Sequence, residues 1–213
     1  MEIKYIKPLV LDSSKQGIWF ISDTHFGHTN IIRFCNRPFS SIKEMDETII
    51  NNWNSVVKPN DIVFHLGDFA FASNARWKQL IQALNGHIYL IVGNHDEIRY
   101  PGHQVFDLFE GVTSQLIVKI DGQAAYLNHY PFLCYGGAYR DPKQAVYALH
   151  GHVHLLREHN IGKDFERMSH AFPYQYDVGV DFNNYTPISW NEVCNKITTQ
   201  VKYNVNQMYW INS

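Results

Sequence analysis

Residues 17–25, Gly-Ile-Trp-Phe-Ile-Ser-Asp-Thr-His, set the pattern that organises this chain: a short apolar run that ends in an acid and an imidazole. A run of this kind is typical of a strand that is buried on both faces. The pattern returns at residues 61–68, which end in Gly-Asp, and at residues 87–96, which end in Gly-Asn-His-Asp. We therefore expect three buried strands, each delivering polar side chains at its carboxyl end.

Helical patterns separate these strands. Residues 41–57 open with Ser-Ile-Lys-Glu, which resembles a capping box, and the Lys-Pro-Asn of residues 58–60 stops the helix. Ser73 or Asn74 caps a second helix, which Asn-Gly closes at residues 85–86. The expected inner faces carry Ile42, Met45, Ile49, Ile50 and Trp53 in the first helix and Trp77, Leu80, Ile81 and Leu84 in the second. Strands and helices that alternate at this spacing indicate parallel βαβ units.

The second half of the chain has a different pattern. Residues 115–120 and 123–128 flank Asp121-Gly122, which is a strong hairpin signal. Further elements are expected as strands at residues 146–149 and 176–180, a helix from Ser189, and a strand near residues 200–205. We predict one domain over residues 1–213: an α/β fold with a mixed β-sandwich of two sheets flanked by helices. The strands should be parallel first and antiparallel later, with the loops gathered at one edge.

Composition bounds the classes of function. The 213 residues are 45% hydrophobic and 18% charged, which is a globular profile large enough to bury a substantial core. The formal net charge of -2 argues against a broad basic face that would hold extended nucleic acid. It leaves room for a small anionic substrate, because bound metal cations would supply positive charge locally. The sequence does not decide the oligomeric state.

The cysteines and the apolar segments bear on location. Cys35, Cys134 and Cys194 are odd in number, widely spaced and without a CxxC pair, so a reducing compartment is expected. The N-terminal residues have no long apolar region of the kind that marks a secretory signal. No stretch approaches the roughly 18 uncharged apolar residues of a membrane span. We expect a cytoplasmic protein.

Five polar segments lie where the predicted strands run out into loops. They are Asp23-Thr-His25, Gly67-Asp68, Gly93-Asn-His-Asp96, Asn128-His129 and Gly151-His-Val-His154. Ligands of open α/β sheets collect beyond the carboxyl ends of strands, so the fold would bring these segments together. The Asp-x-His spacing of the first segment, repeated as His-x-His in the last, lets both side chains face one point. Carboxylates, imidazoles and an amide are what a hydrolytic site with two metal ions requires.

These segments, in their order, resemble the pattern of the calcineurin-like metallophosphoesterase superfamily, which reads DxH, GD, GNHD or GNHE, H and GHxH. The resemblance covers about residues 18–181, and it implies a four-layer fold in which helices flank two sheets. It places Asp23, His25 and His154 on one metal ion, Asn94, His129 and His152 on the other, and Asp68 as the bridge between them. His95 would protonate the leaving group, and Asp96 would fix the His95 ring.

Mixed nitrogen and oxygen ligands suit manganese, iron, zinc or nickel better than magnesium or calcium. We expect two divalent transition metal ions, with manganese favoured. Two such ions about 3.5–4 Å apart lower the pKa of bound water and clamp phosphoryl oxygens. The resulting hydroxide would attack phosphorus while His95 acts as general acid, a role typically worth about 10²–10⁴-fold in rate.

Other residues are weaker candidates for substrate contacts. His28 could reach a phosphate, and Arg33 and Arg37 follow the first metal motif. The loop at residues 130–145 leaves His129 and returns to a ligand strand, so it should pass near the metals. Its candidates for stacking on a base or gripping a phosphate are Tyr135, Tyr139 and Arg140, with a packed surface loop as the equal alternative. The residues we interpret as structural are His65, His150, Asp177 and Asp181.

The substrate class follows less directly. Residues 67–73 read Gly-Asp-Phe-Ala-Phe-Ala-Ser, without the arginine of the GDxxDRG segment found in protein phosphatases of the superfamily. We therefore expect a phosphodiester substrate that is small or nucleotide-like. A metal-dependent nuclease or a phosphomonoesterase is the alternative within the same chemistry. A non-catalytic scaffold on the same fold is the alternative from another class, and it predicts altered ligands.

Overall fold

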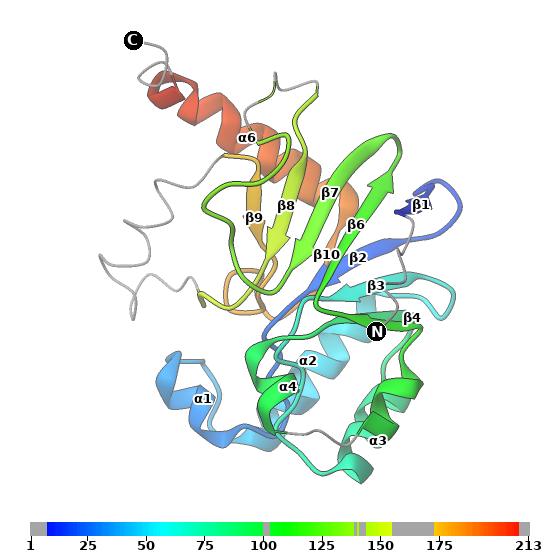
Figure 1. Ribbon diagram of the computed structural model, residues 1–213. Coiled ribbons are helices and arrows are strands. Elements are labelled where there is room, and N and C mark those ends of the chain that lie inside the picture. Colours follow the sequence, from blue (N-terminus) through cyan, green and yellow to red (C-terminus); the bar gives the residue numbers. More distant parts are fainter. Residues whose placement is uncertain (1–7, 100–102, 139, 141–143, 155–172, 209–213) are drawn as a thin grey trace.

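Two five-stranded sheets form the centre of the molecule (Figure 1). The computed structural model describes residues 8–99, 103–138, 140, 144–154 and 173–208. The first sheet has the order β10-β2-β3-β4-β5, with strands Ile188–Ser189, Ile18–Ile21, Ile62–His65, His87–Ile91 and Gly111–Thr113. The second has the order β1-β6-β7-β8-β9, with strands Leu9–Leu11, Gln115–Ile120, Gln123–Asn128, Tyr147–His150 and Gln175–Asp177.

Helices flank these sheets, as predicted. They are α1 (Thr29–Phe34), α2 (Ile42–Val56), α3 (Asn74–Ala83), α4 (Asn94–Arg99), the 3-10 helix η1 (His103–Leu108) and α6 (Trp190–Met208). Figure 1 shows α1 to α4 together below the first sheet, with strands β6 to β9 of the second sheet above it. None of the helices in the described part of the chain has both the length and the apolar character to cross a membrane. The predicted α/β fold with two mixed sheets is confirmed.

The caps of α2 and α3 lie where the sequence predicts them. The Ser41 hydroxyl accepts a hydrogen bond from the Glu44 backbone N–H at 3.2 Å, and Ser73 accepts one from Arg76 N–H at 3.4 Å. The Glu44 carboxylate reaches back to the Ser40 N–H at 2.8 Å. These bonds satisfy N–H groups that the first turn of a helix leaves unpaired.

Two hydrophobic cores hold the layers together. Between the sheets, Phe20 and Phe64 of the first sheet pack with Val118 and Leu127 of the second and with Trp190 of α6. On the other face of the first sheet, residues of β2 to β4 pack against Met45, Ile49 and Trp53 of α2 and Trp77 and Leu80 of α3. The first sheet is therefore buried on both faces, as its near-continuous apolar strands require.

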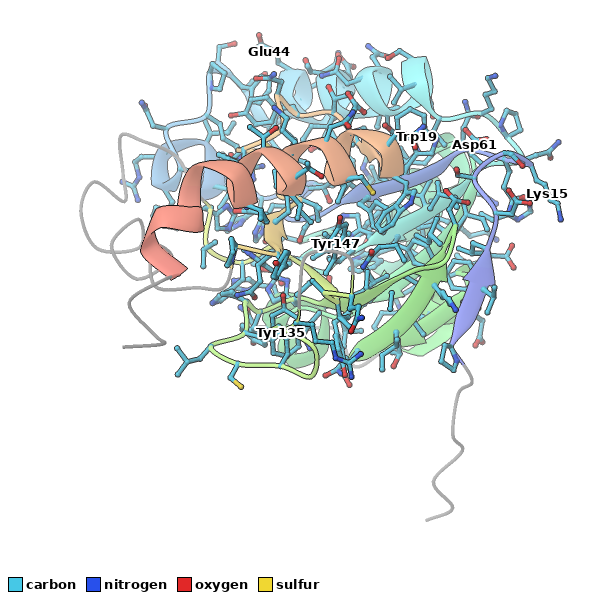
Figure 2. All side chains as sticks on the ribbon, turned by 90° about the horizontal axis from the view of Figure 1, so that it is seen from above. Lys15, Trp19, Glu44, Asp61, Tyr135 and Tyr147 are labelled. Atoms are coloured by element: carbon cyan, nitrogen blue, oxygen red, sulfur yellow. The ribbon has the colours of Figure 1, made fainter. Side chains whose placement is uncertain are left out.

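The outer face of β7 and β8 is covered by a loop in the described residues. Tyr126 and Ala148 on that face pack against Phe132, Tyr135 and Ala138 of the segment that connects the two strands. Figure 2 shows Tyr135 on the opposite side of the molecule from Glu44, which lies on α2. Tyr135 is thus part of a small packed cluster of its own.

Of two expectations about the second half of the chain, that of antiparallel strands is confirmed only in part, and that of a strand near residues 200–205 is wrong. Strands β6 and β7 form the predicted antiparallel hairpin through Asp121 and Gly122, but β1–β6, β7–β8 and β8–β9 are parallel. The 129–146 connection is long enough to carry the chain back to the other end of the sheet, so β8 runs parallel to β7. No strand forms near residues 200–205, because α6 continues through Met208. Its buried residues Val193, Ile197 and Val201 recur at helical spacing.

Candidate metal centre

The two sheets present the carboxyl ends of their parallel strands at one shared edge. Strands β2, β3 and β4 are parallel in the first sheet, as are β7, β8 and β9 in the second. A short bridge joins the sheets at this edge. The Ser22 N–H donates to the Val178 carbonyl at 3.1 Å, and the Val180 N–H donates to the Ser22 carbonyl at 3.0 Å. The loops that follow these strands therefore meet.

Asp68 lies at the middle of the group that these loops form. Its Oδ2 is 3.5 Å from His25 Nε2 and 3.6 Å from His129 Nε2, and it is 3.9 Å from His95 Nε2. Its Oδ1 accepts a hydrogen bond from the His95 backbone N–H at 3.0 Å. One carboxylate thus faces three imidazoles that come from two separate strand ends and from α4.

Two sets of ligand atoms flank Asp68. In the first set, atoms of Asp23, His25 and His154 lie within 4.8 Å of one another, and His154 Nε2 is 3.8 Å from Asp23 Oδ1. In the second set, His129 Nε2 lies 3.1 Å from Asn94 Oδ1. The His152 ring adjoins this second set, with its centroid 5.0 Å from that of His129. The structure therefore brings together all seven residues that the sequence pattern nominates as ligands.

The His25 side chain tests whether these residues fit a metal ion. It is 1% exposed, and within the described part of the chain neither of its ring nitrogens has a hydrogen-bond partner. Burial, followed by the positive charge available to His154, holds the His25 pKa well below its ordinary value. A buried neutral imidazole without a partner costs free energy unless something else uses its lone pair. A transition metal ion would do so, and the surrounding nitrogen and oxygen atoms suit one.

The neighbouring carboxylates also favour a cation. Burial raises the pKa of Asp68, and the nearby Asp23 charge raises it further. Burial lowers the pKa of His154, but the Asp23 charge and a hydrogen bond to Asp181 outweigh it, so this pKa lies well above the ordinary value. Burial lowers the pKa of His152 as well, with His129 adding to the effect. Bound cations would relieve the repulsion between the two carboxylates.

Five of the seven candidate ligands have a backbone in the left-handed region. Their φ angles are 58° at Asp23, 49° at His25, 58° at Asp68, 71° at His152 and 45° at His154. This conformation is uncommon outside glycine, and clusters of it are typical of functional sites. Aspartate and histidine adopt this conformation more often than most residues other than glycine, but that preference is too weak to have located it at these positions.

Asp96 has a different role from the one predicted. Its carboxylate accepts hydrogen bonds from the backbone N–H groups of Asp68 at 2.7 Å, Phe69 at 2.9 Å and Gly93 at 2.8 Å. These bonds correct the expectation that Asp96 holds the His95 ring. Asp96 instead ties the loop after β3 to the loop after β4, and burial raises its pKa to about 6.

Of the predicted substrate contacts, His28 lies at the candidate centre, and Arg33 lies on the surface of α1. The His28 ring stacks on Phe71 with centroids 3.9 Å apart and lies 5.4 Å from the His25 ring, so it belongs to the centre. The exposed Arg33 lies with its guanidinium 5.3 Å from the ring centre of Phe34.

The remaining contacts lie elsewhere. Tyr135 is 7% exposed and packs against Tyr126 and Phe132, which corrects the expectation that its ring is open to a base. Arg140 is exposed, and Tyr139 lies outside the described residues.

The residues interpreted as structural are confirmed in part. The His65 Nε2 bonds to Thr24 Oγ1 at 2.9 Å, while its Nδ1 accepts from the Gly67 N–H at 3.2 Å. His150 is buried as predicted. Arg37 does not point to a substrate, because its side chain is buried and paired with Asp181 at 2.8 Å. No local pattern predicts this pair, because its members are 144 residues apart.

Comparisons with known proteins find similar sequences and a similar structure. The chain is 43% identical over 136 residues to an uncharacterised protein of Methanocaldococcus jannaschii, a match covering 56% of this chain and 77% of that protein. It is 29% identical over 183 residues to the Gene 66 protein of Mycobacterium phage L5, covering 76% and 86%. A crystal structure of a protein of unknown function from Aquifex aeolicus superposes with a TM-score of 0.63 at 29% identity, covering 84% of this chain and 97% of that one.

The family model described as calcineurin-like phosphoesterase matches residues 17–200, a span that contains every candidate ligand. Since that match covers most of the sequence, the chain belongs to the calcineurin-like phosphoesterase family.

Proposed function

We propose that this protein is a metal-dependent hydrolase of phosphodiesters, acting on a small or nucleotide-like substrate. The observation that carries the proposal is the convergence of six candidate ligand side chains around a seventh, the buried Asp68. One of the six is His25, whose ring nitrogens have no hydrogen-bond partner among the residues that the structure describes. The family contributes the reaction class, and the geometry contributes the residues. A scaffold without activity has no use for a complete ligand set.

Two divalent transition metal ions fit the two sets of atoms. Asp23, His25 and His154 would hold one ion, and Asn94, His129 and His152 the other, with Asp68 shared between them. When bound, the ions supply Lewis-acid activation of water and neutralise charge on the phosphoryl oxygens. We favour manganese among the metals that such mixed ligands accept.

His95 is our candidate for the general acid. Its side chain is 34% exposed, so it faces both the centre and solvent, where a substrate would enter. Its backbone N–H is held by Asp68, and its ring lies 4.7 Å from that of Phe71. A proton donated from its ring to the leaving oxygen would let an alkoxide depart as an alcohol.

Substrate contacts are proposed from the residues around this opening. The His28 ring, stacked on Phe71, lies within 6.5 Å of the His95 ring and can hydrogen-bond a phosphoryl oxygen. The exposed ring of Tyr130 lies 4.6 Å from the ring of His152, on the side of the second ligand set. An aromatic surface at this place supports a substrate with a nucleobase or another planar group. We propose a cytoplasmic location, in keeping with three free cysteines.

Hydrolysis of bis(p-nitrophenyl) phosphate by the purified protein with Mn²⁺ tests the proposal. We expect turnover that EDTA abolishes and Mn²⁺ restores, and near-complete loss in Asp68→Ala and His152→Asn. His87→Asn is the matched control, because His87 is exposed and pairs with Glu110 outside the centre. Full turnover in EDTA would exclude the mechanism. A screen of phosphomonoesters, linear and cyclic phosphodiesters and single-stranded DNA would then separate the diesterase from the monoesterase and nuclease alternatives.

A further inference from the structure

Arg37 is a buried cation at the back of the candidate centre. It lies between α1 and α2, and its side chain is 0% exposed. Its Nε donates to Asp181 Oδ1 at 2.8 Å and its Nη2 to Asp181 Oδ2 at 2.9 Å. This two-pronged pairing fixes the orientation of both groups, because the planar guanidinium matches the carboxylate geometry.

The remaining donors of Arg37 hold the loop that carries two candidate ligands. Nη2 donates to the Asp23 carbonyl at 2.7 Å, and Nη1 donates to the Thr24 carbonyl at 3.1 Å. Asp23 and His25 on this loop have left-handed backbones, a conformation that is unfavourable for residues other than glycine unless the surroundings enforce it. The guanidinium is one of the groups that enforce it.

Asp181 extends the same arrangement to the third ligand of the first set. Its Oδ2 lies 2.6 Å from His154 Nδ1. In a neutral imidazole only one nitrogen carries a proton, so a proton donated from Nδ1 to Asp181 leaves the lone pair on Nε2. That nitrogen lies 3.8 Å from Asp23 Oδ1, on the side of the candidate centre. Asp181 therefore selects the tautomer and ring orientation that metal ligation requires.

We propose that Arg37 and Asp181 act together as positioning residues for the metal ion held by Asp23, His25 and His154. The inference rests on the metal pair of the proposed function and adds which residues prepare one half of it. The second ligand set is supported differently. Its His129 has Nδ1 2.7 Å from the Leu66 carbonyl, so the Arg37–Asp181 pair should act on the first ion selectively.

Stability alone does not explain the pair. Removing two ionised groups from water is unfavourable, and apolar residues of the same volume are often at least as stabilising. The guanidinium does, however, donate four directed hydrogen bonds to oxygen atoms, and Asp181 makes an orienting bond to a ligand ring. These bonds orient the side chains and the loop that bind the metal ion, which is the contribution that an apolar pair could not make.

Metal titration of the full chain tests the inference. Calorimetry with Mn²⁺, and metal analysis after dialysis against a defined free concentration, should show two ions bound to the wild type. In Asp181→Asn we expect one ion to bind about 10–100-fold more weakly while the other keeps its affinity, as is typical when a partner of a metal ligand is changed. Arg76→Gln is the matched control, because it breaks a partly exposed pair with Asp46 that touches no candidate ligand.

A second readout separates positioning from support of the fold. A purely structural pair would lower the melting temperature equally in EDTA and in Mn²⁺. A positioning pair also shrinks the rise in melting temperature that Mn²⁺ produces. Should Asp181→Asn fail to fold, Arg37→Lys keeps the charge without the fork and gives the same comparison.

The outcomes distinguish this inference from the proposed function. Two ions bound to Asp181→Asn and to Arg37→Lys with wild-type affinities, and with the wild-type rise in melting temperature, would overturn the positioning role alone. A folded wild-type protein that binds no transition metal would overturn both.

Discussion

Replacing Gly67 by alanine is a direct test of how tightly the loops of the centre are packed. Gly67 has a φ angle of +94°, and an added Cβ would lie 2.6 Å from both the Gly93 nitrogen and His129 Nδ1. The left-handed backbone alone costs a residue with a Cβ about 1–2 kcal/mol. The crowding adds about 1–3 kcal/mol, since neither the backbone nor the buried ring can yield freely. We expect Gly67→Ala to lower the free energy of unfolding by about 2–5 kcal/mol.

Gly122 offers a matched control for this substitution. It lies in the β6–β7 turn with a φ angle of +87°, and a Cβ there would meet nothing within 4 Å. Gly122→Ala should therefore carry the backbone cost of about 1–2 kcal/mol without the crowding.

Urea unfolding in EDTA measures the free energy of unfolding of both variants, and Mn²⁺ titration reports the displacement of His129. Our reasoning about the packed loops fails if Gly67→Ala costs no more than Gly122→Ala, or if it binds both ions as tightly as the wild type.

Two further perturbations address the acid and the buried histidines. His95→Ala should keep its metal content but lose about 10²–10⁴-fold in turnover of diesters with poor leaving groups, and much less with p-nitrophenolate, in steady-state assays. Equal losses for both kinds of substrate would rule out the acid role. Burial lowers the pKa of His65 to about 3, against about 6.5 in the unfolded chain. The stabilisation by neutral His65 is therefore complete above about pH 6.5, and it is lost as the pH falls toward about 3. In EDTA, the stability advantage of the wild type over His65→Gln should shrink by about 1.4 kcal/mol per pH unit between pH 6 and pH 4, and a constant advantage in urea unfolding would contradict this.

Local signals in the sequence predicted the elements that place the site. The apolar runs at Ile18–Ile21 and Ile62–His65, the Ser41 cap and the hairpin at Asp121-Gly122 lie where they were expected. Each depends on interactions between residues close in sequence, or on a strand buried on both faces. Short elements without such signals were missed, among them β1 and β10, whose three and two residues carry too little pattern to identify.

The roles of groups that act across the fold could not be predicted in the same way. Asp96 follows His95 in the sequence, which suggested a partnership, yet its hydrogen bonds reach Asp68 and Phe69 27 or 28 residues away. The contact of Asp181 with His154 and Arg37 depends on how β9 sits beside β8. Such contacts depend on the order of the strands in each sheet, and local sequence patterns do not predict that order.

The short bridge at Ser22 gives the molecule a property that neither half has alone. The strand ends that supply Asp23 and His25 belong to one sheet, while those that supply His152 and His154 belong to the other. A metal ion coordinated by ligands from both sheets would cross-link the two sheets and stabilise their association. A chain in which only one sheet has folded would lack both the catalytic centre and the cross-link between the sheets. Binding of the metal would therefore depend on complete folding of the protein.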